Sequence, residues 1–156
     1  PVTKFASVVP GWLAASVSPA RREKPRRGGK GRARVQTRTV HLFNLHLGLS
    51  GIERRMQLKK LLSHAHFGQI SRTSPIVVAG DLNDVWGTLG RQVMRPAGFR
   101  GTDRKPQTFP AYAPVRALDS LYVSGEIQIA SLMSSRLALA RQASDHLPLV
   151  ADLNLS

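Results

Sequence analysis

The sequence contains no cysteine among its 156 residues. This absence excludes disulfide bonds, thiolate catalysis, and zinc or iron sites built on cysteine ligands. It also removes the usual indicator of redox compartment, so the localisation stays open, with the cytoplasm slightly favoured. Long apolar runs are absent too: the longest, at 75–80 and 147–151, fall far short of the roughly 20 residues that a membrane-spanning helix needs. No membrane span is therefore predicted.

Acidic and aromatic residues are scarce. The chain has 9 Asp and Glu against 23 Lys and Arg, a formal net charge of +14. Such a charge favours polyanionic partners, because their binding releases counterions. Aromatic residues account for only 6% of the chain, but 42% of the residues are hydrophobic. A chain of this length and composition is expected to form one domain, residues 1–156, with a packed core.

The positive charge is concentrated between Arg21 and Arg38. This run holds nine basic residues and a single acid, Glu23. Within it, residues 21–34 combine dense charge with Pro25 and three glycines, which predicts an exposed loop or a hairpin connection. Because no aromatic residue interrupts the run to stack on bases, a solvated loop is favoured over direct contact with nucleic acid.

Several apolar runs are typical of buried strands. They are short, rich in β-branched or aromatic residues, and bounded by glycine, proline or polar residues. The predicted strands lie within residues 35–47, 75–79, 118–123, 128–133 and 147–153. Residues 1–20 allow no firm prediction, and residues 101–114, rich in proline and glycine, are predicted to be a loop.

A helical pattern follows the first predicted strand. Ser50 is a candidate N-cap, and the pattern runs from there to about His66. Apolar residues recur through it at helical spacing. They are Ile52, Met56, Leu58, Leu61 and Leu62. A weaker helical pattern covers residues 87–100 and ends near Gly98.

Polar side chains stand at the ends of two predicted strands. Asn44 and His46 belong to the first, and Asp81 and Asn83 follow the second. Functional residues often gather at strand ends, and an Asp-x-Asn pair suits a hard cation or a water held for attack. Because Asp and Asn after glycine are also ordinary turn residues, this motif alone leaves a structural turn as the alternative.

An acid and an imidazole precede the last predicted strand. A carboxylate such as Asp145 helps to keep His146 protonated near neutral pH, so that the imidazole acts on phosphate as a cation, hydrogen-bond donor or general acid. The alternative is a capped strand start with a surface histidine. Asp119 lies in an otherwise apolar stretch, where an ionised carboxylate needs a partner. It either orients a histidine or faces solvent near a loop.

Other candidates have weaker support. His64 and His66 are expected to interact with the last carbonyls of the helix rather than to bind a metal. Asp152, on the last strand, is expected to be structural. Tyr112 and Trp86 are candidates for the wall of a substrate groove, with packing on the core as the alternative for Trp86.

Four motifs, in the same order along the chain, resemble those of the endonuclease/exonuclease/phosphatase superfamily. They are residues 43–47 (FNLHL), 77–83 (VVAGDLN), 108–110 (TFP) with 118–119 (LD), and 144–148 (SDHLP). The superfamily includes deoxyribonuclease-like nucleases, apurinic endonucleases, sphingomyelinases and inositol polyphosphate phosphatases. The resemblance runs from about residue 30 to the end of the chain.

The resemblance implies a fold, a reaction and a cofactor. The fold is α/β, a portion of a four-layer sandwich in which two packed mixed sheets are flanked by helices. The reaction is hydrolysis of a phosphate ester by an activated water, with Mg²⁺ or Mn²⁺ as the cofactor. Asp145, together with Asp81, is the implied metal-binding pair.

The resemblance also implies roles for the other polar residues. Asp81 would activate or orient the attacking water, and Asn83 would position that water or the phosphate. Asp119 would hold His146 in place. The implied contacts to the phosphate oxygens come from Asn44, His46, Asn83 and His146.

In the family, an N-terminal half supplies an asparagine and a glutamate that is a principal metal ligand. Neither Glu23 nor Glu53 follows an apolar strand, where that glutamate belongs. The chain is therefore expected to be one incomplete domain, a portion of a longer protein. An apolar face that the missing half would cover is expected to be exposed.

Two functions follow from these observations. The first is a metal-dependent phosphoesterase that hydrolyses a phosphodiester, nuclease-like or related, and needs the missing half. The alternative is a catalytically incomplete basic module that binds nucleic acid or another polyanion through residues 21–38. The joint presence of so many polar residues at strand ends favours the first. The substrate and the oligomeric state stay open, because members of one fold family differ in their loops.

Overall fold

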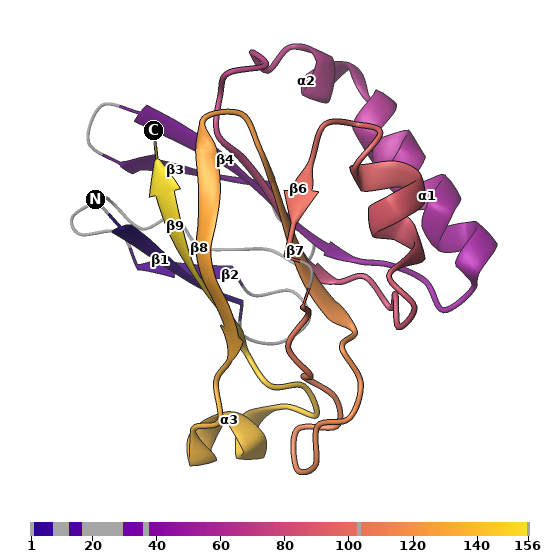
Figure 1. Cartoon of the computed structure of the whole chain (residues 1–156), viewed down its shortest axis with the longest axis vertical. Coiled ribbons are helices and arrows are strands. Elements are labelled where there is room, and N and C mark those ends of the chain that lie inside the picture. The colour runs from indigo at the N-terminus through magenta and orange to yellow at the C-terminus, as the bar shows by residue number, and fades with distance from the viewer. Residues whose placement is uncertain (1, 8–12, 17–29, 36–37, 103, 156) are drawn as a thin grey trace.

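The computed structural model describes residues 2–7, 13–16, 30–35, 38–102 and 104–155, with side chains from residue 39 onward except His66 (Figure 1). These residues form two β-sheets that face each other. The larger sheet has the strand order β3 (Lys30–Val35), β4 (Arg38–His46), β5 (Ile76–Asp81), β7 (Asp119–Ser124), β6 (Arg100–Gly101). The smaller sheet has the order β2 (Leu13–Ser16), β1 (Val2–Ser7), β9 (Leu149–Leu155), β8 (Ile127–Ser134).

The larger sheet is mixed. β4 and β5 are parallel, and the crossover between them contains the helices α1 (Gly51–Ser63) and α2 (Ala65–Gly68). β5 pairs antiparallel with β7, and β3 pairs antiparallel with β4. A parallel pair needs such a long connection, whereas an antiparallel neighbour does not. The polar ends of β4 and β5 therefore emerge at the same edge of the sheet.

Two apolar clusters hold the layers together. Side chains alternate between the faces of a strand, so β4 sends Leu42 toward the smaller sheet and Phe43 toward the helices. The cluster between the sheets contains Val40, Leu42, Val77, Ala79, Leu121, Val123, Ile127, Leu149, Ala151 and Leu153. The cluster under the helices contains Leu58 of α1, and Val93 and Met94 of a short helical segment, η1 (Gly90–Met94).

The predicted α/β sandwich is confirmed as two packed sheets with helices on the outer side of one (Figure 1). Each predicted strand is present, with ends shifted by a few residues. The helix begins after Ser50, which occupies the N-cap position, although its side chain makes no capping hydrogen bond. The second helical pattern is the shorter η1, in which the Arg95 N–H donates to the Gly90 carbonyl at 2.9 Å. A left-handed Gly98 (φ 83°) follows it.

The interpretation of residues 21–34 as a loop is wrong where it can be tested. Residues 30–34 belong to β3, at the edge of the larger sheet. A charged, glycine-containing run resembles a loop in the sequence, so its composition did not predict this edge strand. Residues 21–29 lie outside the described residues.

The predicted apolar face of α1 is also partly wrong. Ile52 is 74% exposed and Met56 is 67% exposed, whereas Leu58 is fully buried. Successive helical residues are about 100° apart, so Met56 points roughly opposite to Leu58. Only one of the two possible apolar stripes can face the sheet, and the stripe containing Leu58 and Leu61 does so.

Between the two sheets, the described apolar side chains are covered. Val77, Ala79 and Leu121 of the larger sheet are buried against Leu149 and Ala151 of the smaller one. None of the helices in the described part of the chain has the length and apolar character that a bilayer span requires.

Candidate active site

Three of the predicted site residues lie side by side across the larger sheet. His46 ends β4 and is paired with Asp81, which ends β5. Asp81 is in turn paired with Asp119, the first residue of β7. Side chains at paired positions point to the same face, with Cβ atoms about 5 Å apart. The register of three strands thus builds a polar row of His46, Asp81 and Asp119.

This polar row continues the apolar face between the sheets. Ala79 and Leu121, two residues away on β5 and β7, belong to the inter-sheet core. Asp81 is 5% exposed and Asp119 is 9% exposed. Asn44, two residues before His46 on β4, is paired with Ala79 and is also buried. The apolar core therefore ends at this edge of the sandwich, where the carboxylates take the place of apolar side chains. His46 is exposed to solvent there.

His146 reaches the row from the other sheet. It precedes β9, after the short helix α3 (Ala138–Ala143). Its Nδ1 donates to Asp119 Oδ2 at 2.8 Å, and its Nε2 lies 3.9 Å from Asp81 Oδ2. The Phe109 ring packs against the imidazole, with centroids 4.9 Å apart. A buried imidazole thus stands between two buried carboxylates.

Thr108 is a site residue to which the sequence motifs assigned no role. Its Oγ1 donates to Asp119 Oδ2 at 2.6 Å, the same oxygen that accepts from His146. Thr108 is fully buried, and its carbonyl accepts from the Leu147 N–H at 2.8 Å. It therefore fixes both the carboxylate and the segment that carries the histidine. Its place in the Thr-Phe-Pro motif is the signal that marks it in the sequence.

Asn83 and Asp145 lie beside the row. Asn83 has φ 51°, a left-handed conformation that asparagine tolerates. Its N–H donates to Asp81 Oδ1 at 2.9 Å, and its Nδ2 donates to the Leu47 carbonyl at 2.8 Å. The Asp-x-Asn motif is therefore a turn, and the same turn holds Asp81 in the row. Asp145 is exposed, next to His146.

The surroundings shift two pKa values. Burial raises the pKa of Asp81, and the nearby Asp119 carboxylate adds to this, against the hydrogen bond from Asn83 and the charges of His146 and His46. The hydrogen bond to Asp119 raises the pKa of His146, helped by the charges of Asp119, Asp81 and Asp145, although burial lowers it. The site therefore favours a protonated imidazole beside a carboxylate that is more basic than usual.

The described residues do not make a metal site on their own. Among residues 39–155, with the exceptions given above, no three His, Cys, Asp or Glu side chains are grouped to hold an ion. Asp119 has one oxygen engaged by both Thr108 and His146. Asp81 and Asp145 remain as the predicted metal-binding pair, and Mg²⁺ in proteins is commonly held by one or two carboxylates together with waters and substrate phosphates.

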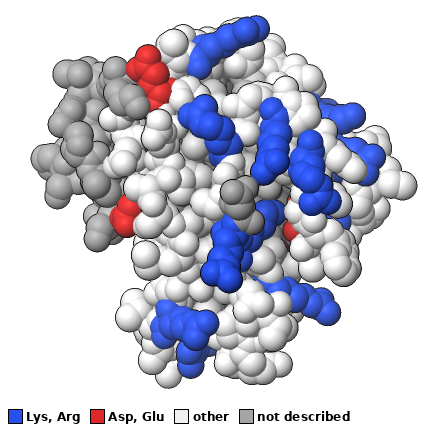
Figure 2. All heavy atoms as spheres, viewed as in Figure 1, with Lys and Arg blue, Asp and Glu red and all other residues white. Residues whose placement is uncertain are grey.

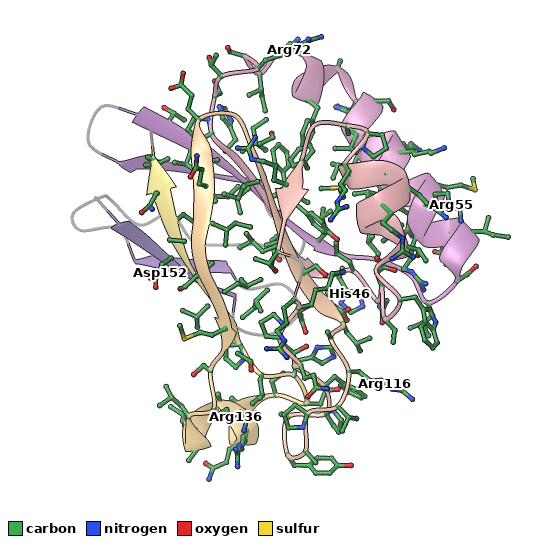
Figure 3. All side chains as sticks on the ribbon, viewed as in Figure 1. His46, Arg55, Arg72, Arg116, Arg136 and Asp152 are labelled. Carbon is green, nitrogen blue, oxygen red and sulfur yellow. The ribbon has the colours of Figure 1, made fainter. Side chains whose placement is uncertain are left out.

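The other candidates lie away from the row. Trp86 is 80% exposed, so the alternative that it packs on the core is wrong. Asp152 accepts from the Ser131 hydroxyl at 2.8 Å on the smaller sheet, in keeping with a structural role. The His64 N–H donates to the Leu61 carbonyl at the end of α1. Figure 3 shows His46 at the end of β4, on the side of the molecule toward Arg116 and away from Arg72.

The chain is similar in sequence to a bacterial protein. The uncharacterized protein YbhP of Escherichia coli (strain K12) is 31% identical over 123 residues, covering 76% of this chain and 47% of YbhP. This chain spans about half the length of the curated relatives it matches. No family model matches the sequence.

Solved structures share the fold. A functionally unknown conserved protein from Enterococcus faecalis V583 has a TM-score of 0.68 and 21% identity, over 100% of this chain and 66% of its own. The mannosyl-6-phosphatase Bt3783 of Bacteroides thetaiotaomicron has a TM-score of 0.62 and 16% identity, over 77% and 53%. An endonuclease/exonuclease/phosphatase from Beutenbergia cavernae has a TM-score of 0.57 and 23% identity, over 76% and 36%. The fold implied by the sequence motifs is thereby confirmed.

Proposed function

Because this chain has the fold of the endonuclease/exonuclease/phosphatase proteins, we propose that the protein is a phosphoesterase that hydrolyses a phosphodiester. The observation that carries this proposal is the His146 imidazole held between Asp119 and Asp81. Hydrolysis of a phosphodiester needs an oriented water and stabilisation of charge on the phosphate oxygens. The carboxylates can orient the water, and the imidazole can stabilise the charge on the phosphate, in one place.

In this proposal, His146 stabilises the phosphate. Its Nδ1–H is committed to Asp119, so the proton on Nε2 is free to be donated to a phosphate oxygen. His46, at the exposed end of the row, adds a second contact from the opposite side of Asp81. The raised pKa of His146 increases the protonated fraction of the imidazole at a given pH, and a charged donor makes the stronger hydrogen bond to an anionic oxygen.

Asp81 is the proposed acceptor for the water proton. Its carboxylate lies beside the His146 imidazole that would hold the phosphate, and a carboxylate within hydrogen-bonding reach of a water can take its proton. The water oxygen bonds to phosphorus, one of its protons passes to Asp81, and the bond to the leaving oxygen breaks. The leaving oxygen takes its proton from solvent. Asn83 keeps Asp81 in position through its N–H.

Dependence on Mg²⁺ or Mn²⁺ is a further part of the proposal, for the whole protein. Asp81 and Asp145 are the proposed ligands in this chain, and the remaining ligands would come from other residues. The metal proposal rests on the family resemblance, since the described residues do not complete a site. Removal of divalent ions with EDTA should abolish hydrolysis, and added Mg²⁺ should restore it.

The residue assignment is tested by hydrolysis of bis(p-nitrophenyl) phosphate by the whole protein in the presence of Mg²⁺. Asp81→Asn and His146→Gln should each lower kcat/KM by about 100-fold or more. Asp81→Asn keeps an oxygen to accept the Asn83 N–H, so the protein should stay folded by circular dichroism. Asp152→Asn is the matched control, because this acid lies on the other sheet. Activity that survives both site changes would contradict the assignment.

A further inference from the structure

A basic pocket of about 330 Å³ lies on the helix side of the larger sheet, opposite to the face that carries the polar row. Its lining begins at Val85, directly after the turn that holds Asp81, and includes Ala117, two residues before Asp119. The remaining walls come from η1, β6 and the loop after β6. Figure 2 shows Lys and Arg side chains gathered over β6 and η1. The basic members are Arg91, Arg95 and Lys105.

The acid nearest to these cations is engaged elsewhere. Asp84 is 1% exposed. Its Oδ1 accepts from the Thr88 N–H and hydroxyl at 2.9 Å, and its Oδ2 accepts from the Leu89 N–H at 2.8 Å. These bonds satisfy the first amides of the helical segment around η1. Asp84 therefore offsets only part of the positive charge in the pocket.

Lys105 has unsatisfied donors in this position. Its Nζ forms an ion pair with Asp84 Oδ2 at 3.8 Å, a distance too long for a hydrogen bond, and among the described residues no atom accepts a hydrogen bond from it. An ammonium has three donors, and leaving buried donors unmatched is costly. Burial lowers the pKa of Lys105, and the neighbouring Arg91 adds to this, against the opposing effect of Asp84. Rotation about the flexible lysine stem would turn Nζ toward an anion in the pocket.

The pocket floor is the ring of Tyr122. Lys105 Nζ lies 5.7 Å from the ring centroid. Gly90 lies against the Tyr122 hydroxyl and Gly101 against the edge of the ring, since a Cβ on either glycine would lie 2.7 Å from the nearest of these atoms. Burial, with the charge of Asp84, raises the pKa of Tyr122 to about 12. The phenol therefore stays neutral and adds no negative charge.

We propose that this pocket binds a phosphate group, at a site separate from the row of His46, Asp81 and Asp119. Arg91 and Arg95, both exposed, line one hollow together with Lys105, whose ammonium has unmatched hydrogen-bond donors. Such cations bind phosphate oxygens through charged hydrogen bonds. Exposed Trp86 stands at its wall. The inference goes beyond the proposed hydrolysis, because none of these residues belongs to the catalytic row.

Binding of inorganic phosphate to the protein, at constant ionic strength, is the direct test. It is followed by calorimetry and by the fluorescence of Trp86, with Trp86→Phe assigning the signal. Lys105→Met and Arg91→Gln should each raise the Kd for phosphate by about tenfold or more. Arg72→Gln, the matched loss of one exposed charge on the loop between α2 and β5 (Figure 3), should change it less than about twofold.

The pocket and the catalytic row are distinguished by a second pair of variants. Asp81→Asn and His146→Gln should leave phosphate binding at the pocket unchanged, whatever they do to hydrolysis. Phosphate binding that is lost in His146→Gln but kept in Lys105→Met and Arg91→Gln would overturn the proposal. If Lys105→Met fails to fold, Arg91→Gln decides the outcome, because Arg91 is exposed on the surface.

A short single-stranded oligonucleotide identifies the source of the phosphate. If Lys105→Met weakens its binding as well as that of inorganic phosphate, the pocket takes a phosphate of a strand. If only inorganic phosphate is affected, the pocket takes a free phosphate. Both outcomes support a phosphate site, whereas unchanged binding of both probes in Lys105→Met and Arg91→Gln would refute it.

Discussion

At the scale of single residues, the two buried carboxylates of the row differ in what they contact. Asp119 accepts hydrogen bonds from Thr108 and from His146, both on the same oxygen. Asp81 accepts one backbone hydrogen bond, from Asn83, and lies 3.9 Å from His146. In the proposed mechanism, Asp119 therefore positions the imidazole, and Asp81 acts on the bound molecule.

Asp119→Asn should lower the pKa of His146, because the hydrogen bond to Asp119 is the main cause of its increase above 6.5. A histidine pKa raised in the folded state stabilises the fold fully below the unfolded pKa, near 6.5, and this stabilisation is lost as the pH rises through the folded pKa. The variant should therefore lose stability chiefly on the acidic side. NMR titration of His146 and unfolding at several pH values measure both effects.

Asp145→Asn is the matched control for this change, because the charge of Asp145 is the smallest of the causes that raise the pKa of His146. It should lower that pKa less than Asp119→Asn does. An unaltered His146 titration in Asp119→Asn would mean that the carboxylate does not set the charge of the imidazole.

At the scale of elements, the close contact between the paired strands β4 and β5 determines where Asp81 lies. Gly80 has φ 129°, and a Cβ at this position would lie 2.1 Å from the Leu45 carbonyl and 2.8 Å from Asn44 Oδ1. Only glycine permits this conformation and this close approach. The two parallel strands therefore come close together one residue before the carboxylate.

Gly80→Ala should lower the free energy of unfolding by about 3 kcal/mol or more, from backbone strain together with the clash on β4. Chemical denaturation measures the loss. Gly68→Ala in α2 is the control, since its Cβ would meet no atom within 4 Å, and it should change stability by no more than about 1 kcal/mol. Equal effects of the two substitutions would show that the strand contact at Gly80 is unimportant.

At the scale of the whole molecule, the net charge of +14 predicts salt-dependent binding of polyanions. For a single-stranded oligonucleotide, log K should fall with log salt by about 0.7 per phosphate contacted. Neutralising three arginines of the run from Arg21 to Arg38 should weaken binding and reduce the slope. Fluorescence anisotropy across a salt series provides the measurement.

The same series tests the alternative function, a basic module without catalysis. That alternative requires binding that Asp81→Asn leaves unchanged, in a whole protein that does not hydrolyse phosphodiesters. Absence of binding at low salt would exclude it. Hydrolysis that depends on Asp81 would favour the phosphoesterase.

Much of the fold could be predicted from local patterns. The β-branched run 76–79 is a fully buried strand, and the helix begins directly after Ser50. Local patterns did not predict features that depend on a contact with a segment far away in the sequence. β3 is a strand because it pairs with β4, and Ile52 is exposed because the sheet takes the other stripe of α1. Neither contact leaves a signal in its own segment.

By itself, the sequence determined the residue types at the strand ends and the order of the motifs. These could be predicted because hydrophobic periodicity and composition indicate structure over a few neighbouring residues. Only the tertiary structure decided that His46, Asp81 and Asp119 form one row, and that Thr108 and His146 meet on one oxygen of Asp119. The basic pocket likewise could not be predicted from the sequence, because its lining residues are spread between positions 85 and 122. Such sites depend on strand register and on the packing of two sheets, which join residues far apart in the chain.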